Sequence, residues 1–216
     1  MSFLYVALGD SLSVGVGTTF FSPGFVQRFR RSAERVLDDH IALRIYAHSG
    51  YKTEDVLNDL KKEYIQDSLR NADIITITAG GNDLISAARK YLDDKNEEDL
   101  SIALKKCITN MTAILDTIHK LKSDSDTPYI IRMFNLYNPF PKEPLAQKWV
   151  KKFDTHLNNL AIHEHVAFVD MQKLFKNNES EYLSIDQIHP NDLGYDRMAE
   201  QLNKLGYGQL GNYEEE

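Results

Sequence analysis

Residues 3–12 read Phe-Leu-Tyr-Val-Ala-Leu-Gly-Asp-Ser-Leu, an apolar run that stops at a glycine and is followed at once by Asp10 and Ser11. The unbroken apolar character of Phe3–Leu8 predicts a buried strand, of the kind found in parallel sheets. Open α/β sheets place their reactive groups just beyond the carboxyl ends of such strands. The stretch therefore predicts a parallel sheet and marks Ser11 as a candidate nucleophile at its edge.

Further apolar segments alternate with helical patterns along the chain. The segment Ile74–Thr78 is rich in β-branched residues, which favour strands. Alternation of strands and helices at this spacing predicts an α/β fold, with helices on both faces of a parallel sheet. The expected strands are Phe3–Leu8, Ile41–Ala47, Asp73–Ala79, Tyr129–Phe134 and Val166–Asp170.

Helix boundaries are marked by capping residues and by charged stretches. Ser22 as N-cap and Pro23 as the first helical residue predict the start of one helix. Apolar residues recur at helical spacing from Leu100 to Leu121 and again from Leu145 to Leu160, which predicts two further amphipathic helices. The charged stretch Asp93–Asp99 is expected to be a solvated loop.

The segment Asp186-Gln187-Ile188-His189 supplies the partners that a nucleophilic serine requires. A histidine titrates near neutral pH, so His189 can take the serine proton and return it to a leaving group. Asp186 can accept from the other ring nitrogen and hold the ring in place. Pro190 follows, and Asn191 is expected to cap the last helix. Taken alone, the segment fits an ordinary surface loop slightly better than a catalytic one.

Two more expected strand ends carry groups suited to stabilising an oxyanion. Asn82 follows the strand that ends at Ala79, within Gly80-Gly81-Asn82-Asp83, and a side-chain amide is a suitable donor. Gly50 follows the second expected strand, where a glycine lets a backbone N–H approach a substrate closely. Each segment is also a common turn, so the hypothesis depends on their coincidence with Ser11 at one edge.

The remaining histidines and the single cysteine favour structural roles. His119 and His156 fall within helical patterns. His163 and His165 are two residues apart, a spacing that does not put both on one helix face, so no metal site is expected. Cys107 lies in the apolar stripe of the long helix, which indicates a core thiol.

Composition bounds the class of protein. With 216 residues and a formal net charge of −7, the chain fits one domain, and phosphate-mediated nucleic-acid binding is disfavoured. A single cysteine excludes an internal disulfide. No apolar run reaches the about 18 residues that a membrane span needs, and no signal peptide is evident, so a cytoplasmic location is expected. We expect one domain over residues 1–208 and an acidic tail over 209–216.

Taken together, the motifs resemble the conserved blocks of the GDSL, or SGNH, hydrolases, in the same order and across nearly the whole chain. The resemblance implies a three-layer α/β/α sandwich similar to flavodoxin, with a five-stranded parallel sheet. It implies a catalytic triad of Ser11, Asp186 and His189, and an oxyanion hole made by Ser11, Gly50 and Asn82. One departure is His48, which stands near a position that many members fill with Asn. The blocks that carry the resemblance are Gly9-Asp10-Ser11-Leu12, Gly50, Gly80-Gly81-Asn82-Asp83 and Asp186-Gln187-Ile188-His189-Pro190.

The segment from Phe20 to Arg28 and the overall size also resemble the spore-germination lipases within this family, which makes spore association an expectation. The resemblance implies a serine esterase or lipase that acts on a small-molecule ester or lipid substrate without metal or organic cofactor. A carbohydrate acetylesterase or a thioesterase with the same triad remains the alternative.

A nucleotide-binding module is disfavoured. Gly15 and Gly17 provide two glycines after the first expected strand, but Phe20 stands where the third glycine of a phosphate-binding loop is required. Neither the acyl chain length of the substrate nor the oligomeric state follows from the sequence.

Overall fold

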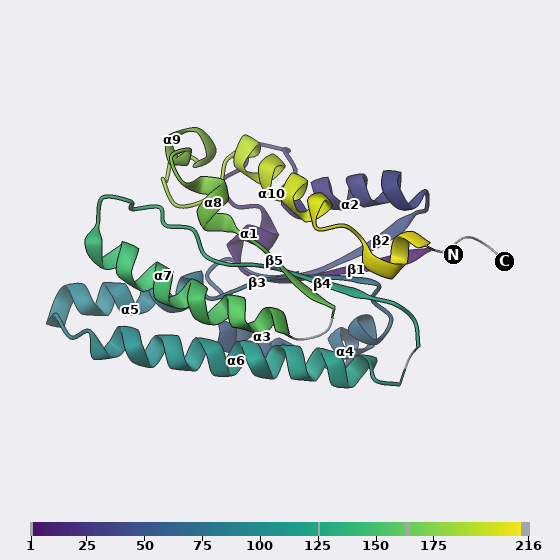
Figure 1. Cartoon of the computed structure of the whole chain (residues 1–216), viewed down its shortest axis with the longest axis horizontal. Coiled ribbons are helices and arrows are strands. Elements are labelled where there is room, and N and C mark those ends of the chain that lie inside the picture. The colour runs from purple at the N-terminus through teal and green to yellow at the C-terminus, as the bar shows by residue number, and fades with distance from the viewer. Residues whose placement is uncertain (1, 125, 163–164, 213–216) are drawn as a thin grey trace.

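The computed structural model describes residues 2–124, 126–162 and 165–212. Its centre is a five-stranded sheet in which all neighbouring strands are parallel, in the order β2-β1-β3-β4-β5 (Figure 1). This confirms the expected α/β class, and each expected strand agrees with the structure to within one residue at either end. The strands are β1 (Phe3–Gly9), β2 (Ile41–Ala47), β3 (Ile74–Thr78), β4 (Ile130–Phe134) and β5 (Val166–Val169).

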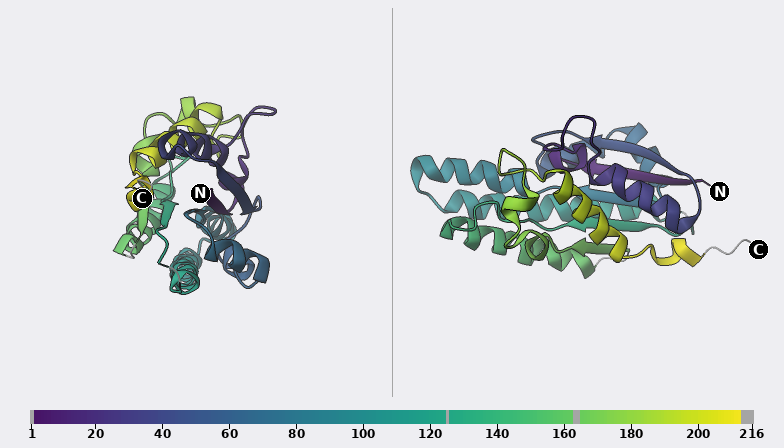
Figure 2. Two further views of the ribbon diagram at one scale, coloured as in Figure 1. Left: turned by 90° about the vertical axis from the view of Figure 1, so that its right-hand side faces the viewer. Right: turned by 90° about the horizontal axis from the view of Figure 1, so that it is seen from above.

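Helices cover both faces of the sheet and complete three layers (Figure 1 and Figure 2). One face carries α1 (Ser11–Val14), α2 (Phe25–Leu37), α8 (Met171–Phe175), α9 (Glu179–Tyr182), α10 (Asp192–Lys204) and the 3₁₀ helix η2 (Gly208–Asn212). The other face carries α3 (Thr53–Asp59), α4 (Glu63–Arg70), α5 (Gly81–Asp94), α6 (Glu98–Lys122), α7 (Pro144–Asn158) and the 3₁₀ helix η1 (Asn159–Ile162).

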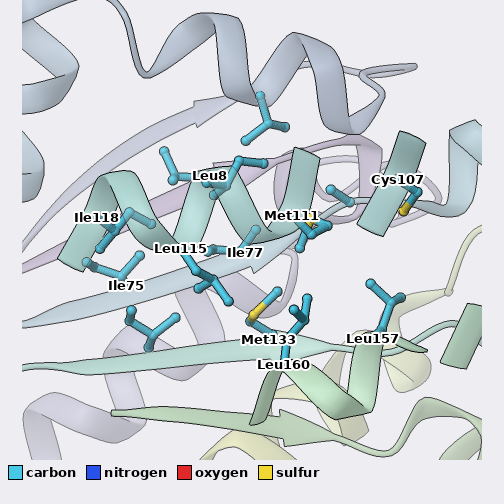
Figure 3. Close-up of a cluster of buried hydrophobic side chains, with 14 of the residues drawn as sticks. Leu8, Ile75, Ile77, Cys107, Met111, Leu115, Ile118, Met133, Leu157 and Leu160 are labelled. Atoms are coloured by element: carbon cyan, nitrogen blue, oxygen red, sulfur yellow. The ribbon is translucent and has the colours of Figure 1, made fainter. Parts of the chain in front are cut away.

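The sheet separates two hydrophobic cores because successive strand residues point to opposite faces. Leu8 and Ile77 lie side by side in register and point toward Met111 and Leu115 of α6 (Figure 3). Cys107 belongs to the same core, as expected, and its burial raises the pKa of the thiol well above its usual range.

The opposite face of the sheet packs against α2 and α10. Tyr5 and Ala7 of β1 point to this side, where the ring of Tyr5 meets Phe29 of α2 edge to face, with centroids 5.7 Å apart. The Tyr5 hydroxyl lies 2.8 Å from Thr76 Oγ1, so the two buried polar groups satisfy each other. Leu210 of η2 is also buried in this core, beyond residue 208 where the sequence predicts the domain to end.

Two local expectations were wrong. The first amphipathic helix begins at Phe25 with Gly24 as N-cap, and not at Pro23. Arg28 Nε donates to the Pro23 carbonyl at 2.9 Å, while the Arg28 backbone N–H donates to Gly24. The side chain of Arg28 therefore binds the Pro23 carbonyl, which would accept a backbone N–H if the helix began at Pro23.

The loop within the charged stretch Asp93–Asp99 is also shorter than expected. Helix α5 runs to Asp94 and α6 begins at Glu98, so three residues connect them. Lys95 adopts a left-handed conformation with φ 59° and donates its N–H to the Tyr91 carbonyl at 2.8 Å, which ends α5. The expectations that concern His163 and the last four residues of the acidic tail lie outside the described residues.

The long helix and the capped last helix agree with expectation. Helix α6 spans the predicted apolar repeat, and Asn191 caps α10 by accepting from the Gly194 N–H at 3.0 Å. Within the described part of the chain, no helix is long and apolar enough to cross a membrane.

The position of Ile77 gives a test of the fold. Ile77 is fully buried between β1 and α6, so Ile77→Ala should lower the free energy of unfolding by about 2–5 kcal/mol. The matched control is Ile102→Ala on the exposed side of α6, which should change it by less than about 0.5 kcal/mol. Urea denaturation of both variants measures the difference, and equal effects would contradict the assigned packing.

Candidate active site

The turn that follows β1 depends on the lack of a side chain at Gly9. Gly9 has φ 141°, and a Cβ there would lie 2.3 Å from both the carbonyl oxygen and Oγ1 of Thr78. Only glycine allows β1 and β3 to approach so closely at their carboxyl ends. Asp10 then caps α1 by accepting from the Leu12 N–H at 3.0 Å, which makes Ser11 the first residue of that helix.

A buried hydrogen-bond network joins this turn to the neighbouring strand. Thr78 Oγ1 donates to Asp10 Oδ1 at 2.8 Å, and the Asp10 N–H lies 3.2 Å from the same hydroxyl oxygen. The hydroxyl of Ser13 lies 2.9 Å from Thr78 Oγ1. Burial raises the pKa of Asp10, and the hydrogen bonds from Leu12 and Thr78 act against that shift. The network fixes the backbone on both sides of Ser11.

His189 reaches Ser11 from a loop between α9 and α10. Its Nε2 lies 2.9 Å from Ser11 Oγ, and its Nδ1 lies 2.6 Å from Asp186 Oδ2. A carboxylate can only accept, so Nδ1 carries the proton and Nε2 faces the serine hydroxyl as an acceptor. The loop packs against Gly17, where a Cβ would lie 2.5 Å from the Pro190 carbonyl oxygen and 2.9 Å from His189 Cβ.

Asp186 is held by more than the histidine. Its Oδ1 accepts from Ser184 Oγ at 2.8 Å and from the backbone N–H groups of Ile188 and His189, each at 2.9 Å. Partial burial by itself would raise the pKa of Asp186, but the hydrogen bonds from His189, Ile188 and Ser184 outweigh it and hold that pKa well below its usual range. Asp186 is therefore ionised whenever His189 is able to act as a base.

Asn82 and Gly50 lie beside Ser11 in the same cleft. Asn82 Nδ2 donates to the Tyr51 carbonyl at 2.9 Å, which uses one of the two N–H groups of the amide and leaves the second for a ligand. Gly50 has φ 86° and lies at the surface of the loop after β2. The N–H of Ser11 belongs to the first turn of α1, where helical N–H groups have no partner within the helix.

The loop that carries Gly50 is fastened to α5 by a buried carboxylate. Asp83 accepts from Thr53 through both oxygens, from Oγ1 at 2.7 Å and from the backbone N–H at 2.9 Å. Asn110 of α6 donates to Thr53 Oγ1 at 3.0 Å. Burial raises the pKa of Asp83, against the hydrogen bonds from Thr53. This contact joins the start of α3, three residues after Gly50, to the helix that carries Asn82.

The segment 135–143 closes the other side of the site and is anchored by Asp154 of α7. Asp154 Oδ1 accepts from the Leu136 N–H at 2.7 Å. The Tyr137 hydroxyl donates to the carbonyl of Ile188, next to His189. Burial raises the pKa of Asp154 to about 7, against hydrogen bonds from Leu136 and Gln172.

A cleft of about 870 Å³ extends from Ser11 and His189 between α5 and α7. Its walls beyond the serine are predominantly apolar. They include Leu84, Ile85, Ala88, Leu92 and Leu100 on one side, and Leu136, Phe140, Leu145, Ala146, Trp149 and Val150 on the other. The cleft can receive an extended apolar group whose reactive end lies at Ser11.

Each residue that the sequence singled out for the site lies at this edge of the sheet. Ser11, Gly50, Asn82 and His189 line the cleft, and Asp186 lies behind His189. The sequence did not predict the roles of Thr78, Ser13, Thr53 and Asp154. No sequence pattern marks these roles, because Thr and Ser are common in strands and turns. Asp154 occupies a position in α7 that any polar helix residue could fill.

The three-layer fold and the carboxyl-edge site place the chain among α/β proteins whose reactive groups follow the strands. Residues 7–197 match the GDSL-like Lipase/Acylhydrolase family. The chain is also 42% identical to Spore germination lipase LipC of Bacillus licheniformis over 210 residues, which are 97% of this chain and 99% of that protein. The chain belongs to the GDSL-like lipase/acylhydrolase family, and it is a carboxylic ester hydrolase.

Solved structures agree with this assignment. The lipase Lip_vut3 from a goat rumen metagenome is 42% identical, with a TM-score of 0.92 over 96% of this chain and 99% of that chain. The lipase/acylhydrolase from Enterococcus faecalis is 19% identical, with a TM-score of 0.68 over 96% of both chains, and so supports the fold alone. The resemblance inferred from the sequence motifs is confirmed.

The raised pKa of Asp154 predicts a pH-dependent stability. An acid whose pKa is higher in the folded than in the unfolded state binds more protons when folded, so this contribution to stability falls as pH rises from about 4 to about 7. Asp154→Asn keeps an acceptor for Leu136 and should raise the free energy of unfolding by about 1–3 kcal/mol above pH 7, and by less near pH 4.

Thermal or urea unfolding across this pH range measures the effect of Asp154→Asn. The control is Asp116→Asn, an exposed carboxylate on α6. A stability gain that is the same at both ends of the range would contradict the role of the buried charge.

Proposed function

We propose that this enzyme is a serine lipase or esterase in which Ser11 is the nucleophile, His189 the general base and Asp186 the group that orients the histidine. The observation that carries the proposal is the chain of contacts from Asp186 Oδ2 to His189 Nδ1 at 2.6 Å and from His189 Nε2 to Ser11 Oγ at 2.9 Å. The distance between His189 and Ser11 allows the histidine to take the serine proton directly. The distance between Asp186 and His189 allows the carboxylate to hold the ring by a hydrogen bond.

The proposed reaction has two acyl-transfer steps. His189 Nε2 takes the proton as Ser11 Oγ attacks the ester carbonyl, and the same proton then leaves with the alcohol. Water attacks the resulting acyl-serine ester, with His189 again as base, and releases the acid and the free serine. Asp186 stays ionised throughout and stabilises the positive charge on His189, consistent with the lowered pKa of its carboxyl group.

The proposed oxyanion hole consists of the backbone N–H groups of Ser11 and Gly50 and the side-chain amide of Asn82. Supporting this assignment, all three residues line the cleft that contains His189. Two fixed contacts preorganise the donors: the bond from Asn82 to the Tyr51 carbonyl and the contact between Asp83 and Thr53. Donors fixed before the substrate arrives need little reorganisation in the transition state.

The cleft favours esters with an extended acyl chain as substrates. Its volume is about 870 Å³, and the walls beyond Ser11 are formed mainly by apolar side chains of α5 and α7. An acetyl group would leave most of this apolar surface exposed to water, which supports a lipase over a carbohydrate acetylesterase. The name of the Bacillus licheniformis relative supports the same choice and a role in spores.

Removal of the proposed nucleophile tests the mechanism. Ser11→Ala should lower kcat by several orders of magnitude, toward the about 10⁶ seen when a triad serine is removed. Asn82→Ala should lower it by about 10²–10³, as expected for one oxyanion donor. Hydrolysis of p-nitrophenyl butyrate by folded variants measures both.

Ser86→Ala is the matched control, because Ser86 lines the same cleft but bonds to Lys52 and does not contact His189. It should keep the wild-type rate. A folded Ser11→Ala variant with wild-type activity would rule out the proposed nucleophile, and a loss below about threefold for Asn82→Ala would remove it from the oxyanion hole.

A blocked cleft tests the acyl-chain assignment. Ala146 lines the cleft from the first turns of α7, so Ala146→Trp should lower kcat/KM for long-chain p-nitrophenyl esters at least about tenfold and leave the acetate ester within about twofold. Lys151→Trp, on the exposed side of α7, is the control. Equal losses for long and short esters would contradict the assignment.

A further inference from the structure

Three large apolar side chains next to the candidate active site lie almost completely in solvent. Phe20 is 88% exposed, Phe21 is 91% exposed and Ile185 is fully exposed. We call these three residues the apolar rim. Single exposed apolar residues are ordinary, but three of this size on two adjoining segments are unusual for a surface that contacts only water.

The two phenylalanines stand at the tip of a tight turn. The Ser22 N–H donates to the Thr19 carbonyl at 2.9 Å, so Phe20 and Phe21 are the two central residues of that turn. Phe21 has φ 64°, a left-handed conformation that bulky residues rarely adopt and that a turn of this kind normally gives to Gly or Asn. The chain thus carries backbone strain and exposes two aromatic rings at the same place, which is typical of a functional surface.

The base of this turn is firmly held. Thr19 Oγ1 donates to Asp192 Oδ2 at 2.6 Å, and Arg28 bonds to the Pro23 carbonyl at 2.9 Å and to Asp196 Oδ1 at 3.0 Å. The rings themselves contact each other, with centroids 4.1 Å apart. The two aromatic side chains are therefore presented outward on an anchored support.

The apolar rim adjoins the catalytic loop. Ile185 immediately precedes Asp186. Gly17, three residues before Phe20, lies against the same loop, since a Cβ there would be 2.9 Å from His189 Cβ and 3.1 Å from Ser184 Oγ. The segment that carries Phe20 and Phe21 therefore packs against the loop that carries Ile185 and His189.

We propose that the apolar rim inserts into the surface of a lipid aggregate and so brings Ser11 to its substrate. The inference rests on the proposed function, because an ester whose acyl chain fills the cleft is itself poorly soluble and is found in such aggregates. Phe and Ile bury their side chains readily at a lipid surface. The net charge of −7 opposes attraction to anionic lipid, and Arg28, the cation beside the turn, is paired with Asp192 and Asp196. The structure assigns a surface of neutral, zwitterionic lipid as the partner.

A second copy of the chain fits the rim less well. Aromatic side chains bury about 150–250 Å² each, so Phe20 and Phe21 contribute at most about 500 Å², and the smaller side chain of Ile185 adds less than either. A stable protein interface buries about 800 Å² on each partner with many surrounding contacts. Insertion into lipid needs no complementary protein surface, so the three residues suffice.

Vesicle binding tests the proposal without catalysis. We would measure flotation of the full-length Ser11→Ala variant with phosphatidylcholine vesicles, alone and with the added changes Phe20→Ser and Phe21→Asn. Asn accepts the left-handed conformation at position 21, so the double change relieves strain and should leave the fold intact. We expect binding that persists in high salt, and at least a tenfold weaker partition coefficient for the double variant.

The control carries Val36→Ser and Ile102→Ser, which remove two exposed apolar side chains from α2 and α6. It should bind vesicles like the parent. In the active enzyme, which retains Ser11, Phe20→Ser with Phe21→Asn should keep the wild-type rate of hydrolysis of soluble p-nitrophenyl acetate. The same double variant should lose hydrolysis of long-chain ester in vesicles.

The proposal is overturned if the parent does not bind phosphatidylcholine vesicles, or if the rim variant and the control bind equally. Binding that requires phosphatidylglycerol and is lost in high salt would also overturn it. So would a dimer in size-exclusion chromatography that the rim substitutions dissociate without affecting lipid binding. Loss of ester hydrolysis in Ser11→Ala alone tests the proposed function, so the two results are separable.

Discussion

The close approach of β1 and β3 at Gly9 and Thr78 is the constraint on which the candidate site depends. With no side chain at position 9, the two strand ends come close enough for Asp10 and Thr78 to exchange hydrogen bonds. The same Asp10 side chain caps α1, so the helix begins at Ser11. The same two strands carry the central rows of both hydrophobic cores, so the rigidity of the sheet is transmitted directly to the serine.

Much of the fold and of the candidate site could be predicted from the sequence because their signals are local. The β-branched run Ile74–Thr78 and the apolar run before Gly9 mark strands by composition, and parallel strands bring their carboxyl ends to one edge. This geometry is enough to bring Ser11 and Asn82 together, whereas His189 comes from a loop between α9 and α10. The contact between Ser11 Oγ and His189 Nε2, at 2.9 Å, depends on how the loop that carries His189 packs against Gly17. No local sequence pattern predicts that packing.

The features that could not be predicted depend on long side chains and on packing between helices. Arg28 moves the start of α2 to Phe25 because its guanidinium binds the Pro23 carbonyl, a contact that capping preferences do not contain. The cleft lies between α5 and α7, whose apolar residues appear in the sequence only as ordinary core positions. The attachment of Leu136 to Asp154 likewise joins a loop to a helix by a single carboxylate.

The exposed side chains and the buried polar groups follow one physical logic. Inside the site, the buried carboxylates of Asp10 and Asp83 accept hydrogen bonds from Thr78 and Thr53, which offset part of the desolvation penalty of burying them. At the apolar rim the balance is reversed, because Phe20 and Phe21 gain nothing from water and Phe21 adds backbone strain. A folded chain tolerates such a cost where binding recovers it, and a lipid surface beside Ser11 recovers it at the place where the substrate enters.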